Sequence, residues 1–229
     1  MPDLVSNKPI STSVGDYLKA IWSVAGAGSA STNALSERLS VAPASVSSML
    51  VRLRRMGFVD YEPYYGASLT ESGSREALRL VRRHRLVETF LLEHLGYDRQ
   101  EVHDEAERLE HAVSDGFTDR LAQFLGHPQH DPHGDPIPAA DGTLAADDSF
   151  PLAEARAGTR VRISKVRDDD APVLDYLEDH GLVPGRRLSI LEVRALDSVV
   201  TVEDEIGKTH ALGESLTRSV FVRGEPDFA

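Results

Sequence analysis

Near the N-terminus, apolar residues recur at the spacing of an amphipathic helix. Val14, Leu18 and Ile21 lie three or four positions apart, and hydroxyl residues from Ser11 onward precede them. Residues three and four apart share one face of an α-helix, and serine and threonine are preferred at its N-cap. The pattern therefore predicts a short helix from Ser11 to about Val24.

The next apolar pattern predicts two more helices joined by a tight turn. Leu35 and Leu39 mark the first, and "SVSSMLVRLRR" carries the inward positions of the second. Pro43 cannot continue a helix but suits the first position of one, and Gly57 suits its end. The stretch "FVDYEPYYGASLTESG" then alternates as two short strands around a turn. A helix–turn–helix followed by a β-hairpin is the winged-helix arrangement.

From about residue 74 the pattern changes to long helices. "SREALRLVRRHRLVETFLLEHLG" predicts one, and "DRQEVHDEAERLEHAVSDGFTDRLAQFLG" predicts one or two more, ending at Gly126. Their apolar stripes are wider than one domain needs, which indicates a helical dimer interface. Residues 127–149 are rich in proline, glycine and aspartate and predict a linker or an ordered irregular crossing.

From Phe150 onward, short alternating runs predict strands. They are "TRVRISKV", "RRLSILEV", "SVVTVED" and "HALGESLTRSVFV", with one short helix, "APVLDYLEDHGL", after the first. Short strands at this spacing are typical of a small β-barrel of SH3-like type. The expected fold class is mainly α with small β parts.

Charge is distributed unevenly along the chain. The net charge of the 229 residues is -12, but residues 1–85 hold 11 Lys and Arg against 7 Asp and Glu. A basic front half on an acidic body is compatible with nucleic acid as a partner. Cysteine is absent, which excludes disulfides and thiolate chemistry and is compatible with a reducing cytoplasm. No apolar run is long enough to span a membrane, and no signal-peptide pattern is present.

The second predicted helix of the helix–turn–helix carries side chains suited to DNA. Small hydroxyl residues at its start can reach base edges or phosphates, and arginines follow on the same helix. The expected contact residues are Ser45, Ser47, Ser48, Arg52, Arg54 and Arg55. Hydroxyls discriminate bases weakly, so part of the specificity should come from DNA shape.

Two of the long helices place histidines and acids on one side. His84 and Glu88 are four residues apart, and the stretch "HDEAERLEH" adds His103, Glu107, Glu110 and His111 within an arc of roughly 100°. Such groups repel one another unless a cation or solvent screens them. A divalent metal site is the preferred interpretation, and a solvated charged face is the alternative. His127, His130 and His133 lie in the proline-rich segment, where we expect exposed side chains rather than ligands.

The motifs resemble a known family. "RRHRLVETFL", "VHDEAERLEHAVSD" and "PHGDPIP" are similar to the metal-binding and dimerisation domain of the diphtheria-toxin-repressor family of metal-dependent transcriptional regulators. The order of parts is also similar, and the resemblance covers essentially the whole chain. It implies a winged helix-turn-helix DNA-binding domain over residues 1–73, a helical metal-binding and dimerisation domain over 74–149, and an SH3-like (FeoA-like) domain over 150–229.

The resemblance also implies two sets of metal ligands. The primary, activating site falls on Asp16, Glu107, Glu110 and His111, and the ancillary site on His84, Glu88 and His103. In three-domain members the SH3-like domain can add a ligand, for which Asp170 is the best match and Asp169 the next. Val173 stands at the position where the family can place a glutamine.

The departures from the family pattern bear on the metal. Iron-type relatives place methionine and cysteine where this chain has Asp16 and Glu107. An all-oxygen and imidazole set suits Mn²⁺, whereas sulfur favours softer metals. Lys19 stands where two-domain manganese regulators offer another glutamate. The resemblance therefore implies the manganese-responsive, three-domain type, with an iron-responsive repressor as the alternative.

The expected function is a metal-activated repressor of manganese homeostasis genes. It implies Mn²⁺ or alternatively Fe²⁺ as cofactor, with two ions per subunit, and a homodimer on a pseudo-palindromic double-stranded DNA operator. No membrane partner and no small organic substrate are expected, and the expected location is the cytoplasm. Two other interpretations remain: a metallohydrolase, for which no general base or oxyanion motif is visible, and a metal buffer or protein-interaction module.

Overall fold

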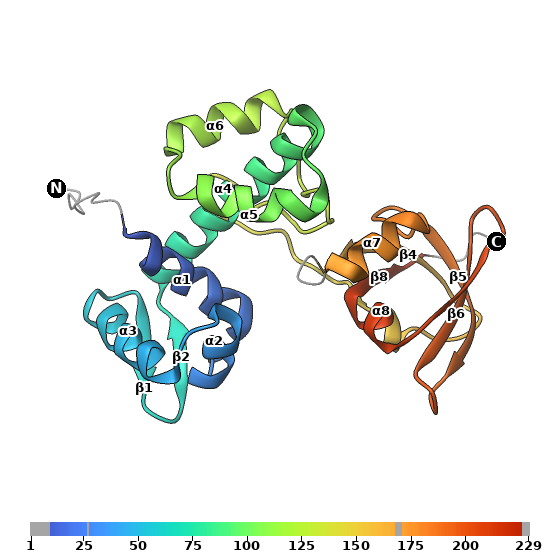
Figure 1. The fold of residues 1–229 in the computed structure, drawn as a ribbon, viewed down its shortest axis with the longest axis horizontal. Coiled ribbons are helices and arrows are strands. Elements are labelled where there is room, and N and C mark those ends of the chain that lie inside the picture. The colour runs from blue at the N-terminus through green and yellow to red at the C-terminus, as the bar shows by residue number, and fades with distance from the viewer. Residues whose placement is uncertain (1–9, 27, 168–170, 226–229) are drawn as a thin grey trace. The chain divides into compact units, whose positions relative to one another are not determined.

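The computed structural model describes residues 10–26, 28–167 and 171–225, which group into two compact units. The first comprises Met1–Val87, Asp104–Phe124 and Pro138–Thr143, and the second comprises Glu88–His103, Leu125–Ile137 and Leu144–Ala229. Figure 1 traces the elements along the chain. The helices are α1 (Thr12–Ala25), α2 (Thr32–Leu39), α3 (Pro43–Arg55), α4 (Glu71–Leu95), α5 (Arg99–Glu110), α6 (Asp115–Phe124), α7 (Ala171–Asp179) and α8 (Glu214–Ser219), with a 3-10 turn η1 (Leu152–Glu154). The strands are β1 (Val59–Glu62), β2 (Gly66–Leu69), β3 (Phe150–Pro151), β4 (Arg160–Val166), β5 (Arg187–Arg194), β6 (Val199–Asp204), β7 (Thr209–Leu212) and β8 (Val220–Gly224).

The winged helix is confirmed, and its elements begin and end where the local sequence requires. The Ser31 side chain accepts a hydrogen bond from the Ala34 backbone N–H at 3.1 Å and caps α2. Pro43 is the first residue of α3, where its missing N–H costs nothing. Gly57 follows α3 with a φ of 78°, a left-handed conformation that glycine adopts without strain. Strands β1 and β2 pair antiparallel as the wing.

The core of the winged helix joins α1 to α2 and α3. Fully buried side chains of α1, α2 and α3 pack in one cluster, among them Leu18, Ile21, Leu35, Val46 and Leu50. Burying an aliphatic side chain of this kind contributes roughly 1.5–3 kcal/mol to folding. A displacement of α1 therefore moves α2 and α3 with it.

The start of α6 is fastened to α4 by ion pairs. Asp115 Oδ1 accepts from Arg83 Nη2 at 2.7 Å, and Asp115 Oδ2 accepts from Arg79 Nη1 at 3.0 Å. Burial acts to raise the pKa of Asp115, but the two guanidinium groups outweigh it and hold this pKa below its usual value. The ion pairs fix the turn after α5, and with it the position of His111.

Within the described residues, no helix combines the length and apolar character that crossing a membrane requires.

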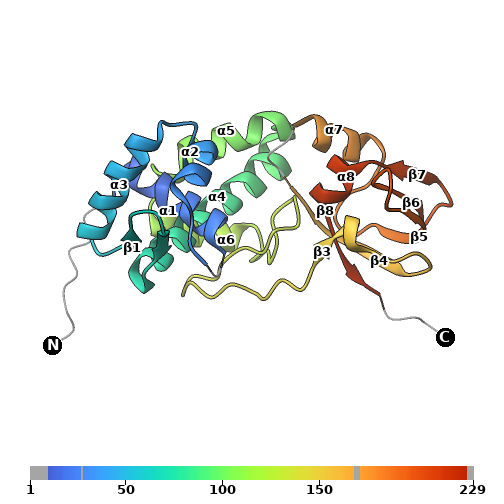
Figure 2. The same cartoon turned by 90° about the horizontal axis from the view of Figure 1, so that it is seen from below.

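The C-terminal strands form an open sheet, so the expected closed barrel is wrong. The strand order is β3-β8-β4-β5-β6-β7, and every neighbouring pair is antiparallel. The edge strands are short, two residues in β3 and four in β7. Helix α8 contacts β3, β6 and β8, and its Leu216 packs on the core. A helix thus covers apolar surface that strands would cover in a closed barrel. Figures 1 and 2 show α7 and α8 side by side next to this sheet.

Two local expectations also fail in the second unit. The stretch expected as strand, "HALGESLTRSVFV", is β7, then α8, then β8. Among the loop histidines, His127 and His130 are exposed, as expected, but His133 is 1% exposed. Asp131 Oδ1 accepts hydrogen bonds from the backbone N–H groups of His133 and Asp135, each at 2.9 Å. This aspartate turn orders the loop.

Candidate metal centre

Helices α1 and α5 bring three of the four expected primary ligands together in the first unit. One ligand atom each of Asp16, Glu110 and His111 lies within 4.8 Å of the other two. His111 Nε2 is 2.8 Å from Asp16 Oδ1 and 3.3 Å from Glu110 Oε1. Asp16 comes from α1, Glu110 ends α5, and His111 follows it directly. The imidazole nitrogen therefore lies between carboxylates from two different helices.

Glu110 is the buried centre of this cluster. Its side chain is 0% exposed, and both carboxylate oxygens accept from Lys19 Nζ, at 2.8 and 2.7 Å. Oε2 is also 2.7 Å from His84 Nδ1. Burial acts to raise the pKa of Glu110, but the hydrogen bond with His84 and the charge of Lys19 outweigh it and lower this pKa. Glu110 is therefore held as a carboxylate.

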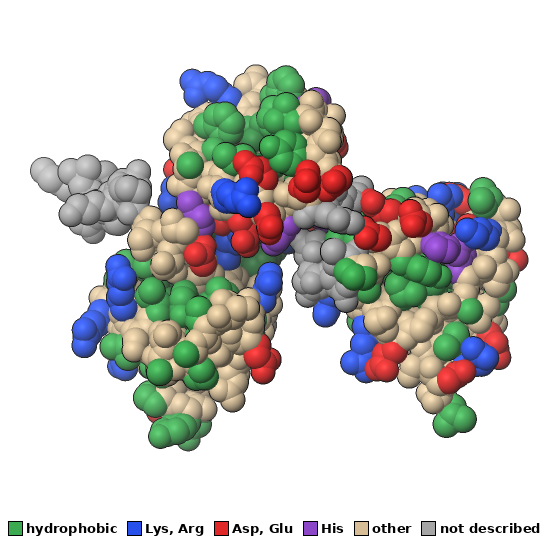
Figure 3. Space-filling view, viewed as in Figure 1, with side chains coloured by type: hydrophobic (Ala, Val, Ile, Leu, Met, Phe, Trp, Pro, Cys, Tyr) green, Lys and Arg blue, Asp and Glu red, His purple; other side chains and the backbone are tan. Residues whose placement is uncertain are grey.

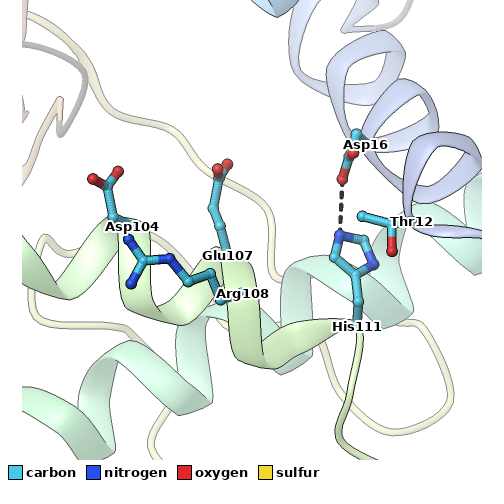
Figure 4. A pocket seen from close by; sticks show the side chains of 6 residues that line it. All are labelled: Thr12, Asp16, Asp104, Glu107, Arg108 and His111. Carbon is cyan, nitrogen blue, oxygen red and sulfur yellow. Dashed lines mark hydrogen bonds and ion pairs between the residues drawn. The ribbon is translucent and has the colours of Figure 1, made fainter.

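Glu107 lies beside these groups rather than within them. It is exposed, and it lines an open cavity of about 340 Å³ together with Asp16, His111, Thr12, Asp104 and Arg108. Figure 4 shows Glu107 on α5, one turn before His111, with its carboxylate extended toward the same side as Asp16. Acidic side chains gather over α5 on the face shown in Figure 3.

The chemistry of these donors fits a divalent cation. Carboxylate oxygens and imidazole nitrogens are ligands for divalent first-row metals. A neutral imidazole N–H can donate fully to one of the two flanking carboxylates, whereas a cation can be shared among all three groups. The cavity leads from solvent to Asp16 and His111. The arrangement therefore meets the requirements for ligand type, convergence and access.

The expected ancillary ligands gather along α4. His84 and Glu88 are one helical turn apart on this helix, and Glu88 Oε1 is 3.1 Å from His103 Nδ1. Glu88 is 1% exposed, whereas the His103 side chain is 33% exposed. Asp169 and Asp170, the expected additional ligands, lie outside the described residues. Val173 is buried in the core of the second unit.

Three known domain families match successive parts of this chain. Residues 10–67 match the iron dependent repressor N-terminal DNA binding domain, residues 70–139 its metal binding and dimerisation domain, and residues 150–224 the FeoA domain. The diphtheria toxin repressor of Corynebacterium glutamicum is 30% identical over 76% of this chain and 82% of its own. The chain belongs to the diphtheria-toxin-repressor family. It is a metal-dependent transcriptional repressor and not an enzyme, so the hydrolase interpretation is dropped.

Relatives of this repressor include manganese regulators. A solved structure described as a manganese-dependent transcriptional repressor in complex with manganese is 40% identical. It covers 93% of this chain and 100% of its own, with a TM-score of 0.87. The transcriptional regulator MntR of Lysinibacillus sphaericus is 36% identical over 49% of this chain and 81% of its own. The iron-dependent repressor IdeR of Mycobacterium bovis is 31% identical over 76% of this chain and 81% of its own. Both manganese and iron regulators are therefore among its relatives.

The expected DNA-contact residues lie on the surface of α3 in this repressor. Ser45, Ser48 and all three arginines are exposed, and Ser47 is half-buried. The Ser47 hydroxyl donates to the Pro43 carbonyl at 3.1 Å, and the Ser48 hydroxyl donates to the Ala44 carbonyl at 2.9 Å. Lys and Arg side chains gather along α3 on the face shown in Figure 3. The helix therefore presents a basic, hydroxyl-bearing surface to solvent.

Three features of the centre lie beyond sequence reasoning. The ion pair of Lys19 with Glu110 joins residues 91 positions apart, and the contact of His84 with Glu110 joins residues 26 apart. Gly15 packs so closely under the site that a Cβ added there would lie 2.9 Å from His111 Cε1. The sequence signals only the first of these features, because Lys19 follows Asp16 by three residues and so shares its helix face.

Proposed function

We propose that manganese activates this repressor by binding at Asp16, Glu107, Glu110 and His111. The observation that carries the proposal is the position of His111 Nε2, 2.8 Å from Asp16 on α1 and 3.3 Å from Glu110 on α5. Three carboxylates and one imidazole suit a hard divalent cation. When bound, the cation supplies positive charge that all four ligands share.

The ligands couple the centre to DNA binding through α1. Of the four, Asp16 alone comes from α1, and α1 shares its core with α2 and α3. Asp16 held against His111 and Glu110 fixes the DNA-binding helices to α5. A ligand favours a conformational state by its differential affinity for it. The state with Asp16 in place is the one that binds DNA.

The ligand set favours manganese over iron. Asp16 and Glu107 supply oxygen, and the set contains no sulfur. Intrinsic affinity nevertheless rises from Mn²⁺ to Fe²⁺, so geometry and availability decide the selectivity. An iron-responsive repressor with the same centre is the second candidate, and the iron-dependent relatives support it.

A second ion binds at the ancillary site, whose ligands are His84, Glu88 and His103, with Asp170 as a further ligand. The buried Glu88 carboxylate beside His103 supports this ancillary site. His84 also contacts Glu110, so it touches both ligand sets. Two ions per subunit follow from this assignment.

The repressor acts on DNA as a homodimer in the cytoplasm. The exposed face of α3 supplies the contacts, with Arg52, Arg54 and Arg55 for phosphates and Ser45, Ser47 and Ser48 near base edges. The dimer surface includes α6, where Phe117 is 47% and Phe124 is 64% exposed. Hydrophobic side chains over α6 are visible in Figure 3. A two-fold dimer requires a pseudo-palindromic operator in double-stranded DNA, and manganese homeostasis genes are the proposed targets.

Single substitutions within α5 and directly after it test the assignment. Glu107→Ala and His111→Ala should abolish metal-activated DNA binding and reduce Mn²⁺ binding, while circular dichroism stays that of a folded protein. His84→Ala should weaken activation less. Glu105→Ala is the matched control, because Glu105 is on the same helix but pairs with Arg108 at 2.8 Å. If Glu107→Ala and His111→Ala respond to Mn²⁺ as the native chain does, the assigned centre is wrong.

A further inference from the structure

Lys19 lies at the buried side of the proposed metal centre. Its ammonium contacts both oxygens of Glu110, at 2.8 and 2.7 Å, and its side chain is 19% exposed. Lys19 follows Asp16 by three residues on α1, so the two share one helix face. Helix α1 therefore presents an acid to His111 and a cation to Glu110.

The carboxylate of Glu110 has a cationic partner within the protein itself. Oε2 is shared between Lys19 and His84, and Oε1 between Lys19 and His111. A divalent ion ligated by Glu110 must share these oxygens with the ammonium or replace it. Like charges a few ångströms apart repel strongly where water is excluded, and Glu110 is fully buried.

We propose that Lys19 is an internal competitor for the metal, which raises the Mn²⁺ concentration at which the repressor responds. This inference rests on the proposed function, because it requires Glu110 to be a metal ligand. The same ion pair joins α1 to α5. Lys19 is thus a positioning residue that sets the response threshold and does not bind the metal.

The competition has a signature that a purely structural lysine lacks. Removing one partner of a buried ion pair leaves the other charge uncompensated, so loss of the ammonium destabilises the metal-free fold in either case. Competition adds a second effect with the opposite sign, because the uncompensated Glu110 becomes a better metal ligand. Stability without metal and affinity for metal should therefore change in opposite directions.

The test is Mn²⁺ binding, followed by electron paramagnetic resonance of the free aquated ion. All variants carry His103→Ala, which weakens the proposed ancillary site so that the primary site dominates the titration. Lys19→Met and Lys19→Gln should bind Mn²⁺ at least about tenfold more tightly than the parent, which carries His103→Ala alone. Their thermal unfolding in chelator should occur at a lower temperature. Lys19→Arg keeps the charge and should behave as the parent, and Lys208→Met removes an exposed lysine as a control for net charge.

The outcomes separate this inference from the proposed function. Unchanged or weaker Mn²⁺ binding in Lys19→Gln would overturn the competitor role, and Lys19→Gln decides the matter if Lys19→Met does not fold. If His111→Ala loses Mn²⁺ while the Lys19 variants gain nothing, the metal centre stands and only the competition is wrong. If His111→Ala binds Mn²⁺ as the parent does, the proposed centre itself is wrong.

Discussion

Gly15 of α1 packs directly against the imidazole of His111. A Cβ added at Gly15 would lie 2.8 Å from Leu80 Cδ1 and 2.9 Å from His111 Cε1. Ordinary van der Waals contact begins at 3.4 Å. In Gly15→Ala the imidazole must therefore retreat by roughly half an ångström, whereas metal sites hold ligand distances within about 0.2 Å. We expect Mn²⁺ affinity to fall by at least about tenfold.

The effect of Gly15→Ala on stability is the difference between two opposing contributions. Overpacking a core costs typically about 1–3 kcal/mol, whereas alanine is favoured over glycine inside a helix by roughly 1 kcal/mol. The free energy of unfolding should therefore fall by about 0–2 kcal/mol, which corresponds to a loss of a few degrees in Tm. The protein should stay folded at room temperature while its metal response is impaired.

Differential scanning calorimetry and a Mn²⁺ titration measure the two effects separately. Gly116→Ala on α6 is the matched control, because its new Cβ would meet nothing closer than Arg120 Nη1 at 3.4 Å. This control should bind Mn²⁺ as the native chain does and should not be destabilised. A Gly15→Ala protein that matches the control in both measurements would refute the packing of Gly15 against His111.

Three further predictions concern DNA binding and the second unit. Arg52→Ala and Arg55→Ala should each weaken DNA binding and lower the slope of log affinity against log salt by about 1, measured by fluorescence anisotropy; an unchanged slope would remove them from the phosphate contacts. Burial acts to raise the pKa of Asp147, but Lys165 at 2.7 Å and Ser149 outweigh it and hold this pKa well below its usual value. The ion pair therefore stabilises the fold above about pH 4, and this stabilisation is lost as the pH falls further. Melting curves should accordingly show Asp147→Asn to be less stable than the native chain at pH 7 and equal to it at strongly acidic pH, and a constant difference would contradict the pairing. Gly134→Ala should destabilise the second unit by at least about 2 kcal/mol, because Gly134 has a φ of 90° and its new Cβ would lie 2.0 Å from the Ser164 carbonyl oxygen. An unchanged midpoint of urea unfolding would refute this close approach.

Local sequence signals were enough to predict the winged helix and most of the helices. Pro43, Gly57 and the 3.6-residue apolar spacing act within one or two turns of the chain, so the sequence predicts where α3 begins and ends. The same signals fail for α8, because six residues are too few to show helical periodicity between two strands. Sheet closure also has no local signal. It depends on strand pairing across the whole domain and on where α8 packs.

The candidate site was predictable as a set of residue types but not as a network. Spacing places Glu107, Glu110 and His111 on one side of α5, and the family resemblance adds Asp16. The contacts of Glu110 with Lys19 and His84 depend on how three helices pack. The burial of His133 likewise depends on the Asp131 turn, which composition alone does not reveal.

The most direct test of the account is a metal titration of DNA binding by the full chain. The DNA fragments are the region upstream of the gene that encodes this protein and candidate metal-transporter promoters. Binding is measured in a titration with Mn²⁺, in one with Fe²⁺ under anaerobic conditions, and in chelator alone. We expect tight DNA binding at micromolar Mn²⁺, and we expect chelator to abolish it and Fe²⁺ to support it less well. Equal or stronger activation by Fe²⁺ would mean that Asp16 and Glu107 do not determine the metal, and DNA binding that ignores metal would contradict the proposed activation.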